Sequence, residues 1–147
     1  MAKRVLFLCT GNYYRSRFAE ILFNVLARQG ELDWIADSRG LAIELVPQDG
    51  GAISPFTRAE LVKRGIALDR HPRPPRALRE DDLARAHRVI ALNRAEHHPY
   101  LQKQFPVWTD RVEYWHVSDL DCASAEQALA EIERHVRALI GQLMIAS

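Results

Sequence analysis

Apolar and polar positions alternate along this chain in a way that predicts strands and helices in turn. Short apolar runs predict strands at residues 3–8, 34–37, 88–92 and 112–117. Helical periodicity and helix-start signals predict helices at residues 17–29, 81–85 and 95–104, from 54 to just before 65, and from 124 onward. Such alternation indicates an α/β fold in which a parallel sheet is covered by helices on both faces.

Helix boundaries and buried faces are also readable from the pattern. Ser54-Pro55 combines a capping residue with proline at the first helical position, and Gly30 and Gly65 follow two helix ends. In the last helix the apolar residues recur at helical spacing, which predicts one buried face: Leu129, Ile132, Val136, Leu139, Ile140 and Leu143.

Length and composition narrow the class of protein. A chain of 147 residues fits a single domain over residues 1–147, and a formal charge of +1 provides no broad basic field for nucleic acid. The apolar runs are too short to span a bilayer, so we expect no membrane segment and no signal peptide. Because Cys9 and Cys122 are the two cysteines, we expect a cytoplasmic protein without a disulfide framework or zinc site.

The most informative chemistry lies directly after the first predicted strand. Cys9 and Arg15 are separated by five residues and precede a predicted helix, whose N-terminal amides and dipole would favour an oxyanion and a thiolate. Arg15 offers a planar fork for phosphate oxygens. The alternative is an inert buried cysteine followed by a solvated arginine.

Three residues between and beside this pair fit a tight anion-binding loop. Gly11 permits close backbone approach, and Asn12 tolerates the left-handed conformation. Ser16 is expected at the helix N-cap, with its hydroxyl able to donate toward the Cys9 sulfur.

The opening segment closely resembles low-molecular-weight protein tyrosine phosphatases. The resemblance is carried by Cys9-Thr10-Gly11-Asn12-Tyr13-Tyr14-Arg15-Ser16, then by Asp37-Ser38-x-Gly40, Gly65-Ile66 and Val89-Ile90-Ala91-Leu92 in the same order. It implies a three-layer fold with a four-stranded parallel sheet of order 2-1-3-4. It also implies a phosphomonoester hydrolase that uses a phosphocysteine intermediate and neither metal nor cofactor. Thr10, Tyr13 and Tyr14 would complete the phosphate-binding loop, and Ser38 would brace Asn12.

The resembled family carries its general acid, usually an Asp followed by Pro, on a loop after the fourth strand. Here that tract reads His116-Val117-Ser118-Asp119-Leu120-Asp121, without proline. We favour Asp119 because of its distance from the strand, and Asp121 is the alternative. Either could also be a solvated loop carboxylate.

Other departures from the family affect specificity. Tyr13 is expected as an aromatic wall against a phosphotyrosyl ring, and its bulk argues against phosphoarginine, for which the resembled branch carries threonine. Arg17 and Arg39 are expected to be solvated charges or, alternatively, a basic rim for acidic phosphopeptides. His97-His98 is expected at an exposed helix end rather than as a metal-ligand pair.

The leading function is hydrolysis of phosphotyrosyl proteins or small aryl phosphates, with inorganic phosphate as product, by a monomer or weak dimer. A thiol-dependent arsenate reductase is one alternative, in which Cys122 would supply the second thiol. The other is a phosphate-binding or phosphoprotein-binding module without turnover, suggested by the irregular Asp119-Leu120-Asp121 tract.

Overall fold

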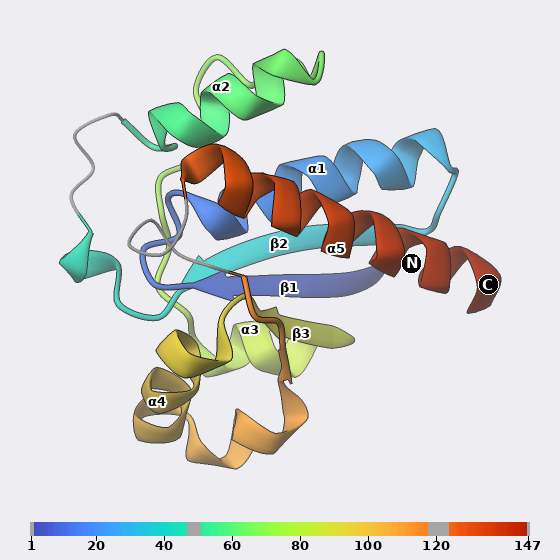
Figure 1. Cartoon of the computed structure of the whole chain (residues 1–147). Helices are drawn as coiled ribbons and strands as arrows, with labels where there is room; N and C mark the ends of the chain where they lie inside the picture. The colour runs from blue at the N-terminus through green and yellow to red at the C-terminus, as the bar shows by residue number, and fades with distance from the viewer. Residues whose placement is uncertain (1, 47–50, 118–123, 147) are drawn as a thin grey trace.

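A four-stranded parallel sheet forms the centre of the computed structural model, which describes residues 2–46, 51–117 and 124–146 (Figure 1). Its strands are β1 Lys3–Cys9, β2 Trp34–Gly40, β3 Arg88–Ala91 and β4 Glu113–Tyr114. They follow the order β2-β1-β3-β4, and every pair is parallel. The expected three-layer fold and strand order are confirmed.

Helices cover both faces of this sheet (Figure 1). On one face lie α1 Arg15–Gln29, α2 Pro55–Lys63 and α5 Ala125–Ala146. The other face carries α3 Glu80–Arg85 and α4 Arg94–Gln104. The remaining helical segments of the described residues are the 3-10 helices Ile43–Leu45 and Pro106–Arg111. Within the described part, no helix combines the length and apolarity that a membrane span requires.

The central strand β1 joins the two halves of the core. Successive side chains of a strand point to opposite faces, so Val5, Phe7 and Cys9 pack with α1 and α5. Leu6 and Leu8 pack on the other side. Both faces of β1 are therefore apolar, as expected for a buried parallel strand, and the alternation places Cys9 toward α1.

Several boundaries differ from the sequence-based expectation. β2 continues to Gly40 rather than ending at residue 37, because its polar end pairs with β1 as far as the Cys9–Gly40 register. β4 contains two residues rather than six, although the amides of Trp115 and Val117 still donate to Ala91 and Leu92 carbonyls (both 2.9 Å). The sequence did not indicate the full length of β2 because its last residues are polar. β4 is short because the parallel pairing with β3 gives way to an isolated antiparallel bridge between Asn93 and His116.

Candidate active site

The loop between β1 and α1 brings Cys9 to the first turn of a helix. Cys9 ends β1 at 2% exposure, and its Sγ lies 2.9 Å from Ser16 Oγ. The expected N-cap role of Ser16 is wrong, because Tyr14 occupies that position and α1 begins at Arg15. Ser16 lies instead inside the first turn, where its hydroxyl faces the sulfur.

Asn12 holds the loop from behind. It adopts the left-handed conformation with φ of 50°, and its side chain is fully buried. Its Nδ2 donates to Ser16 Oγ (2.9 Å) and Ser38 Oγ (2.8 Å), while Oδ1 accepts from Arg73 Nη1 and the Arg76 amide (both 3.0 Å). All four hydrogen-bonding positions of the amide are used. Because Ser16 accepts from Asn12, its own proton is available to the Cys9 sulfur.

Arg73 extends this arrangement into what we call the rear network, defined as Asn12, Glu20, Ser38 and Arg73. Arg73 Nη2 donates to Glu20 Oε1 (3.0 Å), Ser38 Oγ (3.0 Å) and the Ser38 carbonyl (2.9 Å). The Ser38 hydroxyl donates to the same Glu20 oxygen at 2.5 Å. The rear network thus ties the loop to α1, to β2 and to the proline-rich segment that carries Arg73.

Two arginines expected at the surface are buried, so both expectations for them are wrong. Arg17 is 2% exposed and donates through Nη1 to the carbonyls of Ala52 (3.2 Å) and Arg73 (2.9 Å). Burial, followed by the neighbouring charge of Arg73, lowers the pKa of Arg17 to about 10. Arg39 pairs with Asp37 (2.9 Å) and Asp82 (3.2 Å). Backbone carbonyls and carboxylates provide these cations with the partners that water would otherwise supply.

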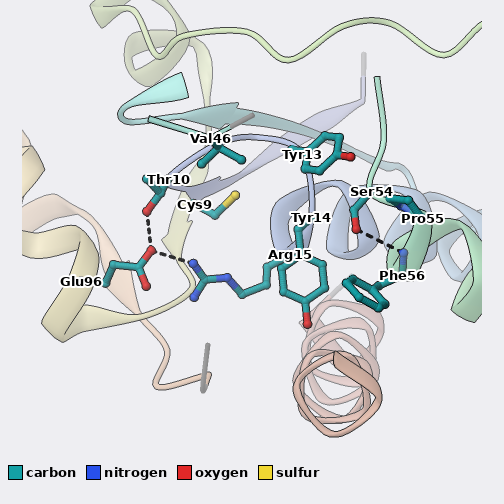
Figure 2. Close-up of a pocket in the computed structure, with 11 residues that line it drawn as sticks. Cys9, Thr10, Tyr13, Tyr14, Arg15, Val46, Ser54, Pro55, Phe56 and Glu96 are labelled. Atoms are coloured by element: carbon teal, nitrogen blue, oxygen red, sulfur yellow. Dashed lines mark hydrogen bonds and ion pairs between the residues drawn. The ribbon is translucent and has the colours of Figure 1, made fainter. Parts of the chain in front are cut away.

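A cavity of about 410 Å³ opens in front of the loop (Figure 2). Its lining comprises Cys9, Thr10, Gly11, Tyr13, Tyr14, Arg15, Val46, Ser54, Pro55, Phe56 and Glu96. Tyr14 and Phe56 meet edge to face, with ring centroids 6.4 Å apart. A Cβ at Gly11 would lie 2.6 Å from Val46, so no larger residue fits there without a shift. The cavity can accept a flat apolar group beside the loop.

Glu96 lies across this cavity from Tyr13, Tyr14 and Phe56, which we call the aromatic wall, and contacts the loop directly (Figure 2). Its Oε2 is 2.6 Å from Arg15 Nη2, accepts the Thr10 hydroxyl, and lies 2.9 Å from His97 Nε2. Burial alone would raise the pKa of Glu96, but the hydrogen bonds from His97, Arg15 and Thr10 and the Arg15 charge hold it well below its ordinary range. The carboxylate is therefore ionised at neutral pH.

His97 supports Glu96 from inside the fold, so the expectation of an exposed helix end is wrong for this residue. It is fully buried, and its Nδ1 accepts the Asn93 amide (3.1 Å), which leaves Nε2 as the donor to Glu96. Burial lowers the pKa of His97, and the imidazole is neutral. Within the ranges described above, no three His, Cys, Asp or Glu side chains are arranged to hold a metal ion.

Both candidate acids, Asp119 and Asp121, and the second thiol, Cys122, lie outside the described residues. Val117, close before them in the chain, is fully buried, and its carbonyl accepts from Asn93 Nδ2 (2.8 Å). Val117 is thus anchored beside the N-terminus of α4.

Sequence reasoning missed Glu96 and Arg73. Glu96 follows Asn93 by three residues, and its amide bonds to the Asn93 side chain (3.0 Å), so the local pattern indicates only a capped helix start. Arg73 reaches Asn12 across 61 positions of the chain, from a proline-rich loop with no periodic pattern. Neither residue carries a local signal of its role.

Comparison with known proteins covers nearly the whole chain. The family model for low molecular weight phosphotyrosine protein phosphatase matches residues 4–145. A low-molecular-weight protein tyrosine phosphatase from T. tengcongensis is 30% identical, with a TM-score of 0.76 over 99% of this chain and 100% of that one. YwlE from Bacillus subtilis, in a mutant form, is 26% identical, with a TM-score of 0.79 over 97% and 99%.

A structure named YwlE arginine phosphatase, with a phosphorylated active-site serine, is also 26% identical and has a TM-score of 0.77 over 96% and 97% of the two chains. None of the curated protein sequences matches significantly. Because the family model spans all but the ends of the chain, the protein belongs to the low-molecular-weight protein tyrosine phosphatase family of cysteine-dependent phosphatases.

Proposed function

We propose that the protein hydrolyses phosphotyrosyl proteins or small aryl phosphates, with Cys9 as nucleophile. The observation that carries the proposal is the Cys9 thiol at the first turn of α1, 2.9 Å from a hydroxyl and on the wall of an aromatic-sided cavity. A helix N-terminus and a hydroxyl donor both favour the thiolate over the thiol.

The reaction has two steps in this proposal. The Cys9 thiolate attacks phosphorus and displaces the aryl oxygen, while Arg15 and the loop amides stabilise the charge on the phosphoryl oxygens. Water then attacks the phosphocysteine and releases inorganic phosphate, and the Ser16 hydroxyl stabilises the departing thiolate. Thr10, Gly11, Asn12, Tyr13 and Tyr14 complete the loop around the phosphoryl group.

A proton donor for the leaving oxygen is still required, and we assign this role to Asp119, with Asp121 as the alternative. Glu96 lines the cavity but is unsuitable, because its lowered pKa leaves it ionised at neutral pH. A positioned acid typically contributes 10²–10⁴-fold to such a step.

The aromatic wall supports aryl substrates over phosphoarginine, although one relative at 26% identity is named an arginine phosphatase. Tyr13 and Phe56 present large apolar surfaces to the cavity, against which a phenyl ring can stack. We also propose a cytoplasmic location, because a thiolate nucleophile requires a reducing environment. The same proposal includes a monomer or weak dimer.

The test is hydrolysis of para-nitrophenyl phosphate across pH by the parent and by Cys9→Ser, Asp119→Asn and Asp121→Asn. We expect no turnover with Cys9→Ser and a loss of about 10²–10⁴-fold in only one aspartate variant. A phosphotyrosyl peptide and a phosphoarginine peptide, compared by kcat/KM, test the substrate class. Phosphate-sensitive alkylation of Cys9 without any turnover would overturn the assignment and indicate a binding module.

A further inference from the structure

At the side of the cavity opposite the aromatic wall, one carboxylate oxygen accepts hydrogen bonds from three side chains. Glu96 Oε2 receives Arg15 Nη2 at 2.6 Å, the Thr10 hydroxyl, and His97 Nε2–H at 2.9 Å (Figure 2). Thr10 and Arg15 are also residues of the loop that would bind a phosphoryl group. An anion from the protein itself therefore occupies donors of the anion-binding loop.

This carboxylate is held firmly in place from the side of α4. His97 is fully buried, and the Asn93 amide fixes its tautomer so that Nε2 carries the proton. The Asn93 side chain caps the same helical turn by accepting the Glu96 amide (3.0 Å). Since His97 and Thr10 are neutral donors, the cationic donor on this oxygen is Arg15.

The pairing affects how Arg15 can receive a ligand. A bidentate grip on phosphate uses two N–H groups of the guanidinium fork, and in this structure Nη2 already binds Glu96. An incoming oxyanion must either take Nη2 from Glu96 or bind beside a fixed negative charge. In both routes the Glu96 carboxylate stays close to the ligand, and its repulsion grows with the negative charge of the ligand in a partly buried site where screening is weak.

We propose that Glu96 is a specificity-determining residue that competes with ligand oxyanions for Arg15 and lowers the affinity of the site for doubly charged anions. The inference rests on the proposed role of Arg15 as a phosphate ligand. It distinguishes Glu96 from a residue that only positions Arg15, because removing a positioning residue weakens anion binding, whereas removing a competitor strengthens it.

The decisive variant is Glu96→Gln, which keeps an acceptor oxygen for its three donors and removes the charge. Binding of inorganic phosphate is measured by isothermal titration calorimetry and by protection of Cys9 from iodoacetamide. We expect about tenfold tighter phosphate binding in Glu96→Gln. Glu96→Ala, a second variant that lacks the acceptor, is expected to shift affinity in the same direction.

A second readout reports charge alone. Cys9 is alkylated with anionic iodoacetate and neutral iodoacetamide, and the ratio of the two rates is compared between variants. We expect this ratio to rise about fivefold in Glu96→Gln. The matched control is Asp110→Asn, which removes one negative charge from an exposed position on the Pro106–Arg111 turn and is expected to change neither measurement.

Weaker or unchanged phosphate binding in both Glu96 variants, or an unchanged alkylation ratio, would overturn the inference. Neither readout needs turnover, so the two proposals fail separately. Tighter phosphate binding by Glu96→Gln in a protein without hydrolysis would support this inference and overturn the proposed function. Normal hydrolysis with unchanged phosphate affinity would do the reverse.

Discussion

Behind the loop of residues 9–16, the fully buried amide of Asn12 makes four hydrogen bonds, whereas in front of it Arg15 pairs with Glu96 at the wall of an open cavity. Glu96 retains 25% side-chain exposure, and Asn12 has none. The two sides use similar chemistry, hydrogen-bonded amides, carboxylates and guanidinium groups. They differ at the centre of the rear network, where Asn12 and Ser38 are fully buried, although Arg73 and Glu20 at its edge keep 19% and 16% side-chain exposure.

This difference indicates which contacts can be exchanged for a ligand. Asn12 and Ser38, the buried members of the rear network, have no water to replace a lost partner, so these hydrogen bonds fix the loop geometry. At the cavity side, a ligand anion can replace Glu96 on Arg15 while Glu96 keeps its hydrogen bonds from Thr10 and His97. We infer that the rear network keeps the loop rigid and that the Arg15–Glu96 pair adjusts ligand affinity.

The largest effect is expected from Asn12→Gly. Glycine accepts the left-handed backbone conformation, so the variant removes the four hydrogen bonds without adding backbone strain. We expect the free energy of unfolding to fall by about 1–3 kcal/mol, and kcat for an aryl phosphate to fall about 10²-fold because the loop loses its geometry. Urea denaturation and steady-state kinetics measure the two quantities.

Asn24→Ala is the matched control for this prediction. Asn24 also makes paired side-chain hydrogen bonds, to the amide (2.8 Å) and the carbonyl (3.1 Å) of Ala36, but lies away from the loop. We expect a comparable loss of stability with kcat within about twofold of the parent. Equal losses of kcat in the two variants would contradict a specific role for the rear network.

A smaller effect is expected from Arg73→Lys. One ammonium cannot reproduce the fork that reaches Asn12 through one nitrogen and Glu20 and Ser38 through the other. We expect a loss of about 1–2 kcal/mol in the free energy of unfolding and of about tenfold in kcat.

The control for Arg73→Lys is Arg64→Lys, at nearly the same exposure (20% against 19%). Arg64 joins Glu60 on α2 to Glu133 on α5, and neither carboxylate lines the cavity. The control is expected to lose stability without a change in kcat. An unchanged kcat in Arg73→Lys would show that the network carries stability alone.

The sequence predicted the frame of the molecule because its signals are local. Apolar runs and helical periodicity placed the strands and helices, and the spacing of Cys9 and Arg15 placed the candidate loop between β1 and α1. The strand order came from the family resemblance and is confirmed. These features depend on neighbours a few residues apart, which a single sequence displays directly.

The partners of the loop were not predictable in the same way. Arg15 and Glu96 are 81 positions apart, and Glu96 has the sequence context of an ordinary first-turn glutamate. Arg17 was expected in solvent because the sequence does not show the Ala52 and Arg73 carbonyls that receive it. Burial of a charge depends on tertiary contacts that are absent from the local pattern.

The smallest effect is expected at the mouth of the cavity, where Arg15 pairs with Glu96. It is the difference in the free energy of unfolding between the parent and Glu96→Gln, followed as a function of pH. The pKa of Glu96 in the folded protein lies below the value of about 4.3 for an unfolded chain. Ionised Glu96 therefore stabilises the parent above that pH, and the contribution is lost as the pH falls through the folded pKa. We expect a difference of about 1 kcal/mol or less at pH 7, because the pair is partly exposed, and a smaller one at pH 3.

Urea denaturation in phosphate-free buffer at both pH values measures this difference, with Asp110→Asn as the control that should show almost none at either. Because Glu96 raises the pKa of His97 against the effect of burial, the same comparison is repeated in a His97→Gln background, which removes the contribution of His97. A difference that persists unchanged at pH 3 would mean that the Glu96 charge is not its source. A difference as large as that of Asn12→Gly would mean that the mouth is as rigidly built as the rear network, and the contrast between the two sides of the loop would fail.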